Sequence, residues 1–180
     1  MTESNITYHL GIDPGWVNLG AAVTKCENGE WSLVASKTFN PSKLKDPTDE
    51  ICYWAEDVLP DYGMPSTACL ERYVSYKGVN TAEAENILML IGGLREAIRW
   101  TLWRDESTQP ILVRAIEWKT DLVKYLAKNR GFDNPSTSLD KRFSIAAAKC
   151  IIGNHEIKTD HEADAICLSA YPWIFRKETS

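Results

Sequence analysis

The stretch ITYHLGIDPGWVNLGAAVTKCENGEWSLVASKTF, residues 6–39, decides the fold class of this 180-residue chain. Residues 6–13 alternate in polarity and then become apolar before a Pro-Gly pair, which is typical of a strand that runs into a turn. Residues 19–26 and 31–39 are also strand-like, and the Asn-Gly pair between them indicates a hairpin turn. The opening of the chain therefore predicts a three-stranded antiparallel meander.

Helical and strand-like segments alternate after this meander. Helices are predicted over residues 46–62, 81–104, 117–129, 139–153 and 158–175, and strands over residues 66–74 and 110–116. Strand-helix alternation after an antiparallel start predicts an α/β fold with a mixed five-stranded sheet flanked by helices. The chain shows no internal repeat or linker, so we expect a single domain over residues 1–180.

The composition is that of a globular protein, with 44% hydrophobic and 25% charged residues. No stretch approaches the roughly 20 uninterrupted apolar residues of a membrane span, and the first residues lack the features of a secretion signal. The five cysteines form no C-x-x-C pair, which argues against a zinc or disulfide framework. We therefore expect a cytoplasmic protein with no membrane partner.

The net charge of −5 argues mildly against nucleic-acid binding, but the charge is unevenly distributed. Residues 114–149 contain eight Lys and Arg against four Asp and Glu, a local balance of +4. Such a stretch can contact phosphates even in an acidic chain. A solvated helix face explains the same charges equally well.

Carboxylates occur where predicted elements begin or end. Asp13 closes the first strand, Glu71 ends an apolar run, and residues 160–164 (DHEAD) open the last helix. Each has a simpler explanation when it is taken alone. Asp13 can cap the turn that follows it, Glu71 can form an ion pair with Arg72, and the helix dipole favours acidic residues at 160–164. Together they offer the hard oxygen ligands that suit Mg²⁺ or Mn²⁺, and two such ions can clamp a phosphoryl displacement.

Four segments resemble the RuvC-type Holliday-junction resolvases, bacterial or phage members of the ribonuclease H-like superfamily. They are GIDPG at 11–15, GAAV at 20–23, LERYVSYKGVNTAEAENILMLIGGLREAI at 70–98 and DHEADAICLSAY at 160–171. The resemblance extends over nearly the whole chain. It implies a ribonuclease H-like fold and a dimeric, divalent-metal-dependent endonuclease that cuts four-way DNA junctions.

The resemblance also implies a ligand set of Asp13, Glu71, His161 and Asp164 for two Mg²⁺ or Mn²⁺ ions. One ion, on Asp13 and the last-helix pair, would activate water, and the second, on Asp13 and Glu71, would stabilise the leaving 3′-oxygen. Asp160 can replace or assist His161, because helical offsets of three and four from Asp164 point the same way. The resemblance favours His161.

The resemblance also implies DNA contacts in two regions of the chain. The phosphate contacts are Lys119, Lys141 and Arg142, and the loop after the catalytic glutamate offers Tyr73, Tyr76 and Lys77. An aromatic side chain in this loop can stack on an unpaired base. The alternative for Tyr73 is that it packs in the core.

The long helix around Leu88–Leu94 resembles the helix through which the family dimerises. The Gly92-Gly93 pair within it either permits a close approach or merely weakens the helix.

Three other functions are compatible with parts of the sequence. Asn18 and Gly20 after GIDPG superficially resemble the phosphate loop of sugar kinases and actin-like ATPases, but those proteins need a second domain and a later glycine-rich motif. Another ribonuclease H-like nuclease, acting on branched DNA or an RNA–DNA hybrid, is the alternative enzyme. A non-catalytic junction-binding protein is the alternative from a different class.

Overall fold

The computed structural model describes residues 5–60, 64–74, 81–104, 108–135 and 138–176. The strands are β1 (Ile6–Asp13), β2 (Leu19–Glu27), β3 (Glu30–Phe39), β4 (Thr67–Glu71) and β5 (Ile111–Val113). The helices are α1 (Pro47–Val58), α2 (Thr81–Ala97), α3 (Ala115–Arg130), α4 (Lys141–Ile152) and α5 (Asp160–Arg176). A short 3₁₀ turn, η1 (Pro41–Lys43), precedes α1.

The strands form one mixed sheet in the order β3-β2-β1-β4-β5. β1 pairs with β2, and β2 with β3, in antiparallel fashion, whereas β1–β4 and β4–β5 are parallel. Asn28 and Gly29 both have positive φ between β2 and β3, as a tight hairpin with an Asn-Gly turn requires. The predicted meander and the mixed five-stranded sheet are both confirmed.

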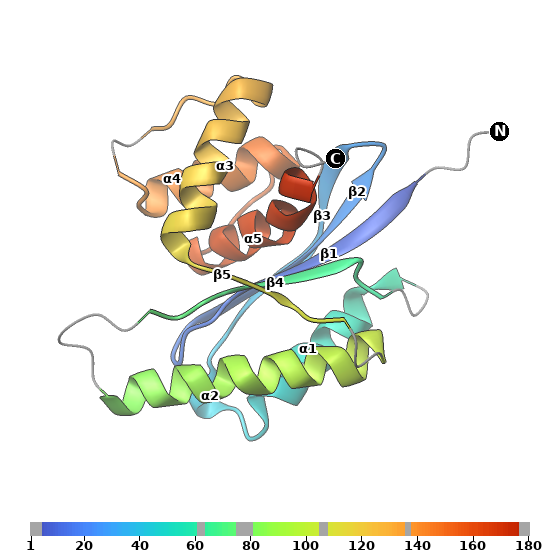
Figure 1. Cartoon of the computed structure of the whole chain (residues 1–180), viewed down its shortest axis with the longest axis vertical. Helices are drawn as coiled ribbons and strands as arrows, with labels where there is room; N and C mark the ends of the chain where they lie inside the picture. The colour runs from blue at the N-terminus through green and yellow to red at the C-terminus, as the bar shows by residue number, and fades with distance from the viewer. Residues whose placement is uncertain (1–4, 61–63, 75–80, 105–107, 136–137, 177–180) are drawn as a thin grey trace.

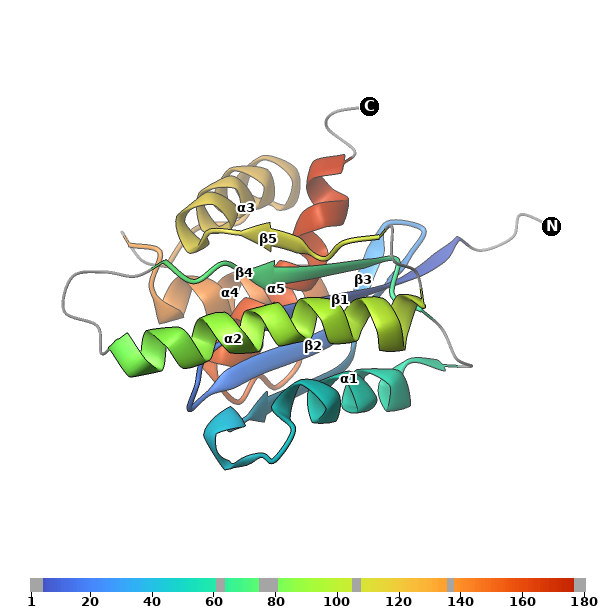
Figure 2. The ribbon, with the colours of Figure 1, turned by 60° about the horizontal axis from the view of Figure 1, so that its bottom comes forward.

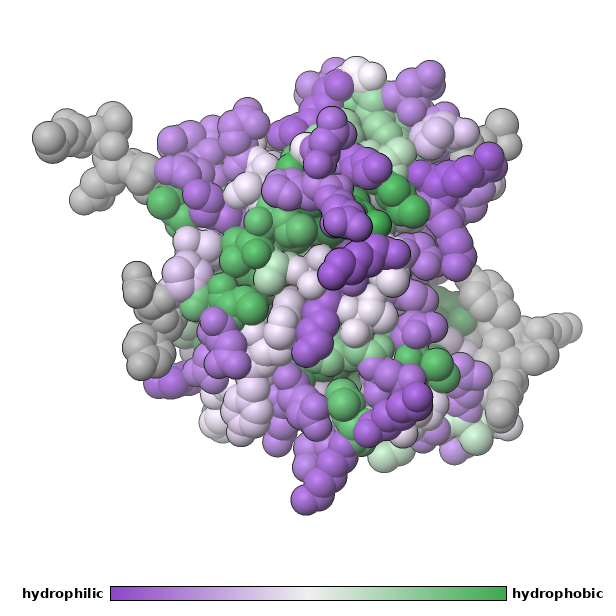
Figure 3. Space-filling view, turned by 180° about the vertical axis from the view of Figure 1, so that it is seen from behind, coloured by the Kyte–Doolittle hydropathy of each residue, from purple (hydrophilic) through white to green (hydrophobic). Residues whose placement is uncertain are grey.

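Helices cover both faces of the sheet (Figure 1). α1 and α2 enclose one apolar core against the sheet, and α3, α4 and α5 enclose the other, in which Trp118 and Phe143 are fully buried. The face seen in Figure 3 carries hydrophilic side chains interspersed with separate groups of hydrophobic ones. Most of the large apolar side chains therefore lie in the two layers between sheet and helices.

Several predicted boundaries differ from the structure: the helix predicted over residues 46–62 ends at Val58, and the strand predicted over residues 66–74 ends at Glu71. The strand predicted over residues 110–116 is only Ile111–Val113, because Arg114 is the N-cap of α3 and its amide donates a hydrogen bond to the Glu117 carboxylate. The helix predicted over residues 81–104 is α-helical to Ala97 and continues as a π-helix, η3 (Ile98–Trp103). None of the helices within the described residues has the length and apolar composition needed to cross a membrane.

Two strand glycines bring α5 unusually close to the sheet. A Cβ on Gly11 would overlap the carbonyl oxygen of Ala165, and a Cβ on Gly20 would overlap the carbonyl oxygen of His161. In both places the obstacle is helix backbone, which cannot rotate away as a side chain can. These glycines therefore set the distance between the start of α5 and the ends of β1 and β2.

Candidate metal centre

The sheet register brings Asp13 and Glu71 together. β1 and β4 are parallel neighbours with Ile12 opposite Leu70. Asp13 and Glu71, the last residues of the two strands, therefore lie side by side at the carboxyl ends of the strands. Asp13 is also paired with Gly20 of β2, against which the first turn of α5 packs. One edge of the sheet thus collects the ends of two strands and the start of a helix.

Asp13, Glu71 and Asp164 converge at this edge. One carboxylate oxygen from each lies within 4.8 Å of the other two. Burial, followed by the negative charge of Asp13, raises the pKa of Glu71 to about 7, although a hydrogen bond from Trp118 opposes the change. Burial also raises the pKa of Asp164, and the charge of Lys119 only partly offsets it. The three carboxylates are therefore held together against their mutual repulsion.

α3 supplies two side chains to this carboxylate cluster. Trp118 Nε1 donates a hydrogen bond of 2.9 Å to Glu71 Oε2, and Lys119 Nζ lies 3.0 Å from Asp164 Oδ2. Burial lowers the pKa of Lys119, but the carboxylates, Asp164 foremost, outweigh it and raise the pKa. Lys119, predicted as a phosphate contact, thus lies within the cluster with 14% of its side chain exposed. No motif in the sequence pointed to Trp118.

The structure gives His161 and Asp160 different partners. His161 Nδ1 lies 2.7 Å from Asp13 Oδ2, and this hydrogen bond raises the pKa of the imidazole. Asp160 Oδ2 instead lies 2.7 Å from Lys141 Nζ. His161 is therefore attached to the cluster through Asp13, whereas Asp160 faces the basic start of α4.

Glu162 fixes the first turn of α5 to β3. Its side chain is buried, with an exposed fraction of 5%, and accepts hydrogen bonds from the hydroxyls of Ser36 and Thr38. Thr38 also hydrogen-bonds the side chain of Thr159, 2.8 Å away. These contacts cross from helix to sheet beside His161 and help to position it. A buried glutamate within the acidic segment 160–164 was the only sequence signal for this role.

The predicted DNA-binding residues other than Lys119 fall into three groups. Lys141 and Arg142 project from the start of α4 with 76% and 72% of their side chains exposed. Tyr73 packs against the core on the α1–α2 side and its hydroxyl is buried, which agrees with the core-packing alternative. Tyr76 and Lys77 lie outside the described residues.

The residues at this edge fit a divalent cation. All three clustered ligands are carboxylates, the donors that Mg²⁺ and Mn²⁺ prefer. Asp164 Oδ1 is buried and accepts no hydrogen bond of ordinary geometry within the described residues, although the Ser144 side chain lies close enough to lower the pKa of the carboxyl. A cation would satisfy this oxygen and offset the repulsion that, after burial, raises the pKa of Glu71.

Comparisons with known proteins give the fold a name. No protein-family model and no curated protein sequence matches the chain. Among solved structures, Thermus thermophilus RuvC in complex with a Holliday junction substrate superposes with a TM-score of 0.68 at 16% identity, over 96% of each chain. A second T. thermophilus RuvC structure gives 0.68 at 17% identity, over 96% of this chain and 97% of that one.

The yeast mitochondrial Holliday junction resolvase Ydc2 aligns with a TM-score of 0.49 at 15% identity, over 94% of this chain and 80% of that one. The two RuvC likenesses establish the fold and confirm, at that level, the resemblance in the sequence. The chain has the ribonuclease H-like fold of RuvC.

Proposed function

We propose that this protein is a divalent-metal-dependent endonuclease that cuts four-way DNA junctions. The observation that carries the proposal is the convergence of Asp13, Glu71 and Asp164 from three separate elements within 4.8 Å. A purely structural role would not favour one buried and two half-buried carboxylates with one shared lysine, because their desolvation is costly. The RuvC fold, solved elsewhere with a Holliday junction substrate, supports this choice of DNA.

The three carboxylates would hold Mg²⁺ or Mn²⁺, with two ions per site as the expected number. Bound cations of this kind supply a metal-activated water and stabilise the leaving oxygen of an in-line displacement. Lys119, released from Asp164 when that carboxylate binds metal, can donate a hydrogen bond to a phosphate oxygen. Its partial burial keeps this charge in a poorly solvated position, where it acts most strongly.

His161 has the placement of a proton acceptor near the cluster. When Nδ1 donates its hydrogen to Asp13, Nε2 is left free to accept a proton. The same ring can instead bind Mn²⁺ through a nitrogen once Asp13 binds metal. Asp160 is the better candidate for orienting Lys141, with which it forms an ion pair.

We further propose that the protein acts as a homodimer through α2. Ile91 and Leu94 point into the protomer's own core, so the available face consists of Leu88, Met89 and Gly92. Leu88 and Met89 are 55% and 75% exposed, and Figure 2 shows α2 crossing in front of the sheet with its outer side uncovered. A two-fold dimer would place two sites on two symmetry-related strands of a junction. A cytoplasmic location, in a bacterial cell or a phage-infected host, remains part of the proposal.

A panel of labelled substrates tests the function. A four-way junction, a fork, a plain duplex and an RNA–DNA hybrid are incubated with the protein in Mg²⁺, in Mn²⁺ and in EDTA. We expect paired incisions in the junction, dependent on either metal, and little cleavage of the duplex. Preferential cleavage of the hybrid would favour another ribonuclease H-like nuclease, and tight junction binding without cleavage would favour a non-catalytic role.

The dimer is tested separately by light scattering after size-exclusion chromatography. Met89→Glu places a charge on the exposed face of α2 and should shift the mass toward one protomer. Tyr53→Glu, at an exposed position on α1 (57%, against 75% for Met89), is the matched control and should leave the mass unchanged. A monomeric wild-type protein on junction DNA would contradict the dimer.

A further inference from the structure

A pocket of about 320 Å³ adjoins the carboxylate cluster on the side of β5. Glu71 forms one wall of it, and the remaining walls come from residues 72–74, which follow β4, and residues 114–116, which begin α3. Its volume is at the lower end of the range for small-ligand sites. Glu71 belongs to both the pocket and the carboxylate cluster. A ligand in the pocket would therefore lie next to a metal ion bound by the cluster.

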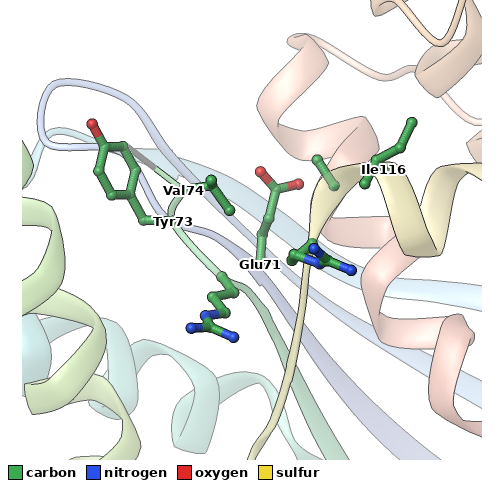
Figure 4. A pocket seen from close by; sticks show the side chains of 7 residues that line it. Glu71, Tyr73, Val74 and Ile116 are labelled. Carbon is green, nitrogen blue, oxygen red and sulfur yellow. The ribbon is translucent and has the colours of Figure 1, made fainter. Parts of the chain in front are cut away.

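The walls of this pocket combine apolar and cationic side chains. Figure 4 shows the Glu71 carboxylate between Val74 on one side and Ile116 on the other. Val74 and Ile116 are aliphatic yet 39% and 61% exposed. Val74 and Ile116 both line the pocket. Together they present an apolar surface beside the polar metal centre, which a flat, apolar group can cover.

Two arginines line the same pocket. Arg114 is exposed and pairs with Glu117 of its own helix, and Arg72 is exposed and lies close enough to Glu117 to contribute, after Arg114, to lowering its pKa. At this rim the two guanidinium groups face one carboxylate, Glu117, while the other acid of the pocket, Glu71, lies on the wall shared with the metal centre. Arginine is the side chain best suited to a phosphate, which it can hold with two hydrogen bonds.

The pocket is held open by its own backbone contacts. The amide of Arg72 donates to the carbonyl of Val113 over 2.7 Å, which keeps the extension of β4 alongside the end of β5. The Arg114 amide donates a hydrogen bond of 3.1 Å to Glu117 Oε2, which fixes the start of α3. These contacts set the spacing of the two walls, so little ordering is needed when a ligand enters.

We infer that this pocket receives the nucleotide adjoining the scissile phosphate, with its base or sugar against Val74 and Ile116 and its outer phosphate at Arg72 and Arg114. The inference rests on the proposed nuclease function and adds a subsite to it. Apolar side chains contribute to base recognition through van der Waals contact, and arginines position the backbone. The choice of cleavage position within a junction would then depend on how well this nucleotide fits.

The test combines enzyme variants with an altered substrate. The cleavage position is mapped on an intact junction, and junctions are then made that lack one base on either side of it. For the wild-type protein, removing the base that occupies the pocket should reduce kcat/KM by about tenfold. Ile116→Ala and Val74→Ala should lose a similar factor on the intact junction and little more on the abasic one.

Tyr53→Ala, an equally exposed substitution on the other face of the sheet, should keep the full abasic effect. Arg72→Gln should likewise lose sensitivity to a methylphosphonate at the outer phosphate, which removes one negative charge. Unchanged melting temperature and metal affinity in Ile116→Ala would show that the metal centre is intact.

Different results would overturn the nuclease function and the nucleotide subsite. Absence of metal-dependent cleavage in the wild-type protein would overturn the nuclease function and the subsite with it. Normal cleavage with independent, multiplicative effects of Ile116→Ala and base removal would leave the nuclease in place and overturn the subsite.

Discussion

Replacing Glu71 with glutamine should stabilise the metal-free protein, and the gain should grow with pH. The substitution keeps the size of the side chain, and the amide oxygen can still accept the hydrogen bond from Trp118. It removes the charge that Glu71 carries when ionised beside Asp13 and Asp164. The variant therefore removes the cost of burying a charge and the repulsion from Asp13, which the wild-type protein avoids by binding a proton or offsets by binding a metal.

The expected magnitude follows from the pKa of Glu71, which is about 7 in the folded protein against an ordinary value of 4.5. The folded state binds more protons than the unfolded state between these values, so this group's stabilisation is present below 4.5 and is lost as pH rises through 7. The gain from Glu71→Gln should stay below about 1 kcal/mol at pH 5 and reach at most about 3 kcal/mol at pH 8.

Urea unfolding in EDTA at pH 5 and pH 8 measures both gains. Glu85→Gln, an exposed substitution on α2, is the matched control and should change the free energy of unfolding equally little at both pH values. Adding Mn²⁺ at pH 8 should stabilise the wild-type protein more than Glu71→Gln, because the variant has lost a ligand. An equal gain at both pH values, or a loss at pH 8, would refute the reasoning.

Further substitutions test how the site is positioned and what its charged residues do. Gly11→Ala should lower the free energy of unfolding by about 1–3 kcal/mol because α5 backbone blocks the new methyl group, and thermal melts against the wild-type protein measure the loss. His161→Ala should lose far more cleavage activity than Asp160→Ala. Because its bond to Asp13 raises the His161 pKa, wild-type activity should rise as pH passes above 6.5; a rate that is flat there would contradict this role. Lys141→Ala should reduce the salt dependence of junction binding by about one unit of slope, and an unchanged slope would make it a solvated residue.

Much of the fold followed from local patterns in the sequence. The Asn28-Gly29 hairpin and the apolar strands fixed the meander, and two strand-ending carboxylates marked the edge where the site lies. These features depend on neighbours in the chain, so turn chemistry and periodicity reveal them.

The partners of the site residues depended on tertiary packing instead. Helical spacing could not choose between Asp160 and His161, and only the placement of α4 shows that Lys141 pairs with Asp160. The short β5 brings the first turn of α3 to the carboxylates, which puts Lys119 in the cluster rather than on the surface. The partners of Asp160 and Lys119 therefore depend on the packing of elements that lie far apart in the chain.

Junction cleavage by Asp13→Asn tests the central claim most directly. Cleavage rate in Mg²⁺ and binding affinity for a labelled four-way junction in Ca²⁺ are measured for wild-type protein, Asp13→Asn and the exposed control Asp57→Asn. We expect Asp13→Asn to lose at least about 100-fold in rate, as expected when a metal ligand is removed, while binding the junction nearly as well as the wild-type protein. Asp57→Asn should match the wild-type protein in both measurements. Wild-type cleavage rates in Asp13→Asn would contradict the assignment of Asp13, Glu71 and Asp164 as the metal centre.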